Sequence, residues 1–242
     1  MAGDRNRTFV LVHGSWHGGW CWRRVSDRLT TEGHRVFTPT LTGLADRSHL
    51  MSAGITLDTH ITDIVNVFRW EEIENAILVG HSYAGWVISG ALEKVHERVA
   101  AAVFLDAFLP ENGDRGYDYT RDANRRGLDE ALAKGAVSRP PPPAAAFGIQ
   151  NPADVAWVEP RLTPQPVSVS LYPIQLGGRR EMVKTKLYIR APRYEQWSFD
   201  KALAKCQADS SWRTMVIEDC SHDVMVDAAP RLADILLGLA VE

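Results

Sequence analysis

The chain has 242 residues, enough for one large domain that buries its core without disulfide or metal staples. Hydrophobic residues make up 45% and charged residues 24%, as in an ordinary globular protein. The 30 acidic and 27 basic residues give a net charge of −3. This balance offers no electrostatic reason to expect nucleic acid or an anionic membrane as a partner.

Two features predict a cytoplasmic protein without a membrane partner. No apolar run approaches the roughly 18–20 residues that span a bilayer. The charged N-terminus, residues 1–7, lacks the apolar segment of a secretory signal. The three cysteines, Cys21, Cys206 and Cys220, have no metal-ligand spacing, so we expect free thiols.

The first 106 residues alternate strand-like runs with helical periodicity. Apolar and β-branched runs predict strands at residues 8–12, 35–38, 76–79 and 99–105. Apolar side chains at helical spacing predict three helices between them, one of which Thr56 could cap. This alternation predicts an α/β fold with a mostly parallel, doubly wound sheet and helices on both of its faces.

The pattern stops between residues 107 and 182, a segment that contains the proline run Arg139–Pro143 and no clean strand. It resumes with expected strands at 186–189 and 214–217, a helix around 199–206, and a last helix that Pro230 opens. We therefore predict a core of residues 1–106 and 183–242. Residues 107–182 are then an insertion that caps it.

The central motif is Leu78-Val79-Gly80-His81-Ser82-Tyr83-Ala84-Gly85, where a buried strand turns sharply into a helix. A serine at such a corner presents its hydroxyl clear of the backbone. The usual pattern is Gly-x-Ser-x-Gly, whereas this chain has alanine at the fifth position and glycine one residue later. Ser82 is the predicted nucleophile.

A serine hydroxyl needs a general base. His222 follows the last expected strand in Asp219-Cys220-Ser221-His222-Asp223, which places it at the same edge of the sheet as Ser82. For the acid that orients His222 we favour Asp106, with Glu195 as the alternative. Asp106 ends a strongly apolar strand and would be costly to bury alone, and Glu195 is the nearest carboxylate after the next strand.

The glycine-rich run from His13 to Trp20 follows the first strand and predicts an oxyanion hole. One backbone N–H would come from Tyr83, after the nucleophile, and the other from Ser15, with Trp16 as the alternative. His13 and His17 are four residues apart, but the glycines around them disfavour the helix that a metal pair would need. We predict neither a metal nor an organic cofactor.

Five stretches together resemble the α/β-hydrolase superfamily, and within it plant methylesterases, hydroxynitrile lyases and small bacterial esterases. They are FVLVHGSWHGGWCW, VFTPTLTGLADRSHL, LVGHSYAGWV, VFLDAFLP and DCSHDVMVD. Among bacterial members the chain is most similar to pyrethroid and carbendazim hydrolases. The resemblance implies the α/β-hydrolase fold, Ser82 with His222 as the catalytic pair, Ser15 with Tyr83 as the oxyanion hole, and the insertion as a lid.

This sequence departs from its apparent relatives at two points. Plant members have an aspartate where it reads Arg193-Tyr194-Glu195, and the lyases have threonine and lysine where it has Gly14 and Asp223. The second difference disfavours lyase chemistry.

The combined interpretation is a serine hydrolase that cleaves small hydrophobic carboxylic esters or carbamate methyl esters through an acyl-enzyme. The alternatives are an amide or lactone hydrolase and a slow-turnover ligand receptor on the same fold. Trp16, Phe108 and Trp157 are the predicted substrate-binding residues. We expect a small-molecule partner only, in a monomer or homodimer.

Overall fold

A computed structural model describes residues 6–240 of the chain, so part of the expectation drawn from residues 1–7 lies outside the described residues. One six-stranded sheet has the order β2-β1-β3-β4-β7-β8, and its strand pairs are parallel. The prediction of a doubly wound parallel sheet is therefore confirmed. The strands are β1 (Thr8–Val12), β2 (Arg35–Phe37), β3 (Ala76–His81), β4 (Val99–Leu105), β7 (Thr185–Arg190) and β8 (Trp212–Val216).

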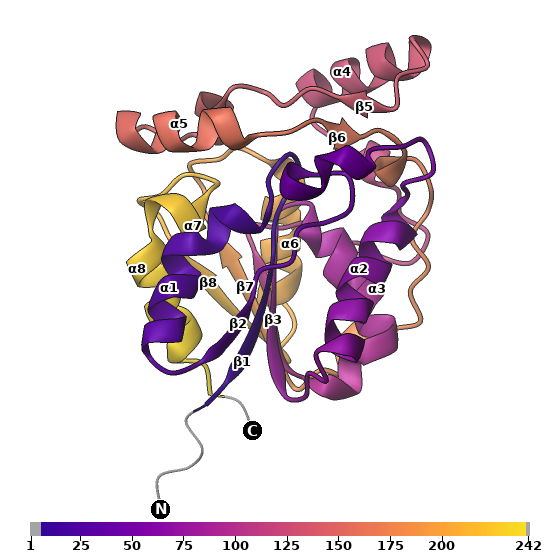
Figure 1. Ribbon diagram of the computed structural model, residues 1–242. Coiled ribbons are helices and arrows are strands. Elements are labelled where there is room, and N and C mark those ends of the chain that lie inside the picture. Colours follow the sequence, from indigo (N-terminus) through magenta and orange to yellow (C-terminus); the bar gives the residue numbers. More distant parts are fainter. Residues whose placement is uncertain (1–5, 241–242) are drawn as a thin grey trace, which may run out of the picture.

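Both faces of the sheet are buried. In β1, Phe9 and Leu11 pack into one apolar cluster, while Val10 and Val12 pack into the other. This alternation with period two explains why the central strands read as continuous apolar runs. The first cluster is covered by α1 (Arg23–Thr31), α7 (Val224–Asp227) and α8 (Ala229–Leu237), and the second by α2 (Leu57–Trp70), α3 (Ala84–Val95) and α6 (Trp197–Gln207) (Figure 1).

Local signals set several helix ends. The Thr59 hydroxyl accepts a hydrogen bond from the Thr56 backbone N–H at 3.1 Å, which closes a capping box at the start of α2. Pro230 occupies the first turn of α8, where the absence of an N–H costs nothing. The short helix α7 was not expected, because four residues are too few to show helical periodicity.

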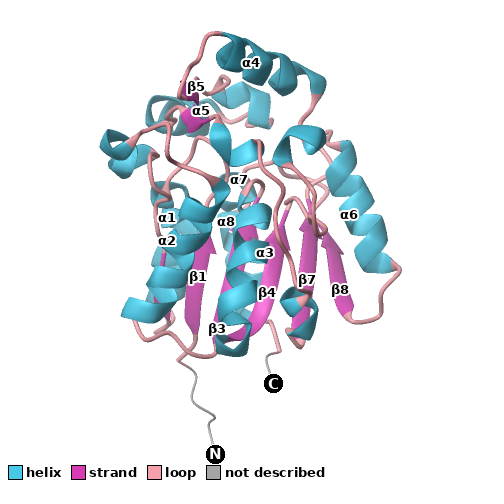
Figure 2. Ribbon diagram, turned by 90° about the vertical axis from the view of Figure 1, so that its right-hand side faces the viewer, coloured by secondary structure: helices cyan, strands magenta, loops and turns pink. Residues whose placement is uncertain are grey.

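The segment between β4 and β7 lies across the carboxyl ends of the sheet strands (Figures 1 and 2). It contains α4 (Asp122–Ala133), α5 (Pro152–Val158) and a two-residue antiparallel pair of β5 (Ser138–Arg139) with β6 (Gln165–Pro166). We expected no strand here, and a ladder this short leaves no alternation in the sequence. We refer to residues 107–182 as the cap.

Among residues 6–240, no helix is both long enough and apolar enough to cross a bilayer.

Candidate active site

Ser82 lies on the turn between β3 and α3 with a φ of +54°, a left-handed conformation that is rare for a residue with a Cβ. The turn is packed tightly on both sides. A Cβ on Gly80 would lie 2.7 Å from Ile88 Cδ1, and a Cβ on Gly85 would lie 1.9 Å from the Phe108 carbonyl oxygen. The close approach of Phe108 therefore explains why the second glycine of the motif stands at position 85.

His222 and Asp106 are in direct contact beneath this turn. His222 Nδ1 lies 2.6 Å from Asp106 Oδ2, and the two side chains are 3% and 0% exposed. A carboxylate only accepts, so Nδ1 carries a proton, and in the neutral imidazole Nε2 is then the acceptor. Asp106 follows β4 with a φ of +42°, and His222 follows β8.

The other carboxylate oxygen of Asp106 is held by β7. Oδ1 accepts hydrogen bonds from Arg190 Nη1 at 2.7 Å and from the Ala191 backbone N–H at 3.0 Å. Burial would lower the pKa of Arg190, but Asp106 and Asp200 together raise it. A buried guanidinium therefore fixes the carboxylate that orients His222, and sequence reasoning did not find it.

Glu195, the alternative acid, is exposed, and among residues 6–240 its one hydrogen bond is that of its backbone carbonyl with Arg121. The carboxylate bonded to His222 is that of Asp106.

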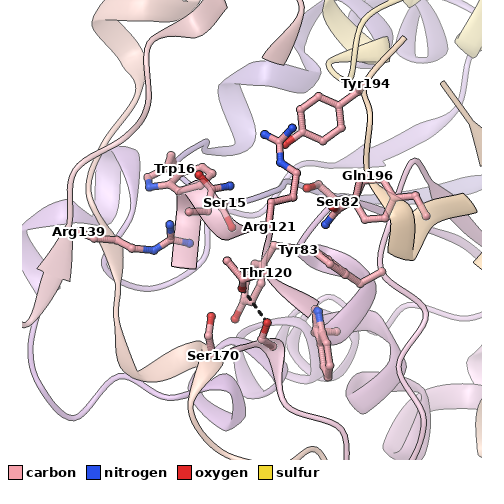
Figure 3. Close-up of a pocket in the computed structure, with 15 residues that line it drawn as sticks. Ser15, Trp16, Ser82, Tyr83, Thr120, Arg121, Arg139, Ser170, Tyr194 and Gln196 are labelled. Carbon is pink, nitrogen blue, oxygen red and sulfur yellow. Dashed lines mark hydrogen bonds between the residues drawn. The ribbon is translucent and has the colours of Figure 1, made fainter. Parts of the chain in front are cut away.

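The imidazole of His222 is enclosed by aromatic rings. It stacks on Tyr194 at 4.1 Å between ring centroids and on Phe199 at 5.7 Å. Both rings line the same pocket as Ser82 (Figure 3). Among residues 6–240, the Ser82 hydroxyl has no hydrogen bond to His222. Such a bond is often completed only when substrate is bound.

The predicted oxyanion residues lie at the pocket. Ser15 and Tyr83 line it, and neither backbone N–H donates a hydrogen bond to any residue in the described range 6–240. The N–H of Trp16, the alternative donor, is taken by Gln165 Oε1 of β6 at 2.9 Å. The geometry thus favours Ser15 over Trp16.

Two buried histidines brace the surrounding loops in their neutral form. His13 Nε2 accepts from the Leu41 N–H, so its Nδ1 donates to the Gly14 carbonyl, and burial lowers the pKa of His13 to about 3. His60 Nε2 contacts the Thr42 carbonyl, so its Nδ1 accepts from the Tyr83 hydroxyl, and burial lowers the pKa of His60 to about 4.

His17 is protonated, in contrast. Its Nδ1 lies 2.8 Å from the Ser15 carbonyl and its Nε2 lies 3.0 Å from Asp223 Oδ2. Both partners are acceptors, so both ring nitrogens must donate. Burial alone would lower the pKa of His17, but the Asp223 carboxylate raises it. Burial would likewise raise the pKa of Asp223, but His17 lowers it to about 2.

This buried ion pair links the loop that carries Ser15 to the loop that carries His222. From the spacing of His13 and His17, a metal site was the one alternative to an oxyanion loop. The structure instead shows both rings hydrogen-bonded within the protein, and no metal-binding cluster exists among residues 6–240.

The pocket also contains two of the three predicted substrate-binding residues. Trp16 and Phe108 line it, together with Trp86 and Phe199. Trp157 is not among the lining residues. It lies on α5 and packs edge-on against Trp20 of η1 (Gly19–Trp22), at 5.2 Å between ring centroids.

The fold and the site together have the arrangement of a hydrolase whose serine lies on the turn between a strand and a helix. This chain belongs to the alpha/beta hydrolase family, which matches residues 9–235. The resemblance inferred from the motifs is therefore confirmed.

Similar proteins of known activity indicate which kind of hydrolase this chain is. The chain is 37% identical over 241 residues to the carbendazim hydrolyzing esterase of Nocardioides sp. (strain SG-4G), covering 96% of this chain and 98% of that protein. Methylesterase 1 of Arabidopsis thaliana is 40% identical over 118 residues, which are 44% of this chain and 41% of that protein. The chain is accordingly an enzyme of the carboxylic ester hydrolase class.

Solved structures share the fold. An extracellular alpha/beta-hydrolase from a Paenibacillus species superimposes with a TM-score of 0.83 at 20% identity, over 96% of this chain and 98% of that one. A pyrethroid hydrolase from Sphingobium faniae JZ-2 superimposes with a TM-score of 0.69 at 20% identity, over 95% of each chain.

Proposed function

We propose that the protein is a serine hydrolase that cleaves small carboxylic esters, including carbamate methyl esters, through an acyl-enzyme. The observation that carries this proposal is the 2.6 Å contact of His222 Nδ1 with Asp106 beside the strained turn of Ser82. It leaves His222 Nε2 free to accept a proton, which is the state that a serine nucleophile requires.

In this mechanism His222 takes the proton of the Ser82 hydroxyl as the oxygen attacks the substrate carbonyl. The N–H groups of Ser15 and Tyr83 stabilise the oxyanion, and losing one such donor typically costs about 10²–10³ in rate. His222 then protonates the departing alkoxide. Water repeats the sequence, with His222 as base, and releases the acid.

The pocket supports a compact substrate with an apolar part. Its walls include the rings of Trp86, Phe108 and Phe199, against which an acyl or aryl group can pack. The enclosed space is about 50 Å³. Binding sites for drug-sized molecules enclose about 300–1,000 Å³, so a larger ester requires movement of the cap side chains. The relative named for carbendazim hydrolysis supports carbamate methyl esters as candidates.

The test is pre-steady-state release of p-nitrophenol from p-nitrophenyl butyrate by the native chain and by Ser82→Ala. We expect a burst followed by steady turnover in the native protein and neither in the variant. A burst without turnover would favour a receptor. Unchanged turnover in Ser82→Ala would remove Ser82 from the mechanism.

A further inference from the structure

Two arginines of the cap line the pocket that contains Ser82. Arg139 belongs to β5, and Arg121 immediately precedes α4. Figure 3 shows Arg139 pointing toward the interior of the pocket, and the guanidinium of Arg121 lying beside the ring of Tyr194. Sequence analysis assigned no role to either residue.

Neither guanidinium forms an ion pair with a carboxylate in the described part of the chain. The side chain of Arg139 has no hydrogen bond or ion pair with any residue between 6 and 240, and it stacks on the Trp16 ring at 4.5 Å. Arg121 donates to the Glu195 carbonyl at 3.2 Å and lies over the Tyr194 ring at 4.4 Å. Its Nε is buried without a partner.

The pocket itself supplies no compensating charge. No aspartate or glutamate is among the described residues that line it. Other arginines of the chain have such partners, for example Arg24 with Asp154 at 2.5 Å and Arg190 with Asp106 at 2.7 Å. A partly buried cation without a counter-ion is costly, and burial lowers the pKa of Arg139 to about 10. An anionic ligand would remove that cost.

We propose that the preferred substrate is an ester bearing a second, ionised carboxylate, which Arg139 and Arg121 bind while Ser82 attacks the ester carbonyl. This proposal rests on the serine hydrolase function proposed above. A guanidinium presents a planar fork of donors that matches a carboxylate. Apolar contacts with Phe108 and Trp86 then hold the connecting segment.

The expected substrate is thus a half-ester of a dicarboxylic acid or a carboxyaryl ester, rather than a fully neutral ester. Hydrolysis of the half-ester consumes one water molecule and yields the dicarboxylate, the alcohol and one proton. The anion that the arginines bind is unchanged by the reaction, so the two cations act in binding and orientation.

The test compares matched substrates that differ in charge. The pairs are monomethyl adipate against dimethyl adipate, and 4-acetoxybenzoate against its methyl ester. Acid release is followed by pH-stat titration and phenol release by absorbance. In the native protein we expect kcat/KM to be at least tenfold higher for the anion of at least one pair. A salt series should lower this preference, because salt screens partly exposed charges.

Arg139→Met removes the charge but keeps a long side chain over Trp16. We expect it to lower the anion-to-neutral ratio of kcat/KM by about 10–100-fold, mainly through KM, as for the loss of a charged hydrogen bond. Arg139→Lys keeps the charge without the fork and should recover part of the ratio. Arg126→Met is the matched control, since Arg126 is an exposed arginine on α4 of the same cap and lies outside the pocket.

Two outcomes overturn the inference. One is a native enzyme that cleaves the neutral member of each pair at least as well as the anion. The other is an Arg139→Met variant that stays folded by circular dichroism and keeps the native ratio. In either case Ser82-dependent hydrolysis of p-nitrophenyl butyrate would leave the proposed serine mechanism standing. Loss of that reaction as well would mean that the function itself is wrong.

Discussion

Replacing Asp106 by asparagine tests the hydrogen-bond pattern of the site directly. Asp106 accepts on both oxygens, from His222 on one and from Arg190 and Ala191 on the other. An asparagine can keep its oxygen toward Arg190 and Ala191, which turns its NH₂ group toward His222 Nδ1. That nitrogen must then accept, so the proton moves to Nε2 and His222 can no longer take the Ser82 proton.

The expected magnitudes follow from the same contacts. The wrong tautomer of a triad histidine costs about 10⁴ in kcat. The lost charge also leaves Asp200, which is 61% exposed, as the remaining ion-pair partner of buried Arg190 among residues 6–240. Breaking a buried ion pair costs about 3–5 kcal/mol of unfolding free energy. Because asparagine retains an acceptor for Arg190, we expect a loss near the lower limit, about 3 kcal/mol.

The assays are kcat for p-nitrophenyl butyrate and unfolding in urea. Adding Arg190→Met to Asp106→Asn should recover stability but not activity, which separates a misfolded protein from a misoriented base. Glu195→Gln is the comparison for the alternative acid and should keep kcat within about threefold of native, since an exposed side chain with no partner at the site contributes little. A kcat for Asp106→Asn within tenfold of native would refute the reasoning.

Two further predictions concern packing and charge. Gly85→Ala should destabilise the protein by about 3 kcal/mol or more in urea unfolding, because its Cβ would lie 1.9 Å from the Phe108 carbonyl oxygen. Gly127→Ala is the control and should be neutral or stabilising, because the space around Gly127 is open. His17→Gln should lower the unfolding free energy by about 3 kcal/mol below pH 6.5. The pKa of His17 is raised in the folded state, so its charge stabilises the native protein below pH 6.5, and this stabilisation is lost as pH rises through the folded-state pKa. The difference in unfolding free energy between the native protein and His17→Gln should therefore shrink in alkaline solution. A difference that stays constant from pH 6 to 9 would contradict the buried ion pair.

Local sequence patterns were sufficient for the sheet and for the positions of Ser82 and His222. Each strand of the central sheet is a short apolar run, and a residue directly after such a run must lie at the carboxyl edge of the sheet. Ser82, Asp106 and His222 each follow a strand end, so topology alone brings them to one edge. Their roles in catalysis stay predictions until the variants are measured.

Contacts between side chains that are far apart in the sequence could not be predicted from local patterns. The choice of Asp106 over Glu195 as the partner of His222 depends on how β7 presents Arg190 and Ala191 to the carboxylate. A signal was present, since an arginine closing an otherwise buried strand needs a counter-ion. The pair of His17 with Asp223 spans 206 residues and has no local signature.

The cap is the least predictable part, because no periodic pattern in the sequence identifies the side chains of the cap that line the pocket. Trp157 and Trp16 are both aromatic residues near the expected pocket, yet only Trp16 reaches it. Similarly, Arg139 stands in a proline-rich stretch with no clean strand pattern, and its position in the pocket depends on the β5–β6 pair. The proposed anion site therefore depends on a two-residue ladder in the cap.

The strain at the site explains why the sheet edge must be so well braced. Trp16, Ser82 and Asp106 all have positive φ angles, and each such residue costs about 1–3 kcal/mol. Each is held by a contact from another element: Trp16 by Gln165 of the cap, Ser82 by the Leu105 carbonyl of β4, and Asp106 by the Ile189 carbonyl of β7. Since these contacts come from three different segments, loosening any one of them should disturb the shared geometry of the proposed oxyanion loop, nucleophile and acid. The proposed catalytic arrangement therefore depends on the whole sheet edge together with its cap.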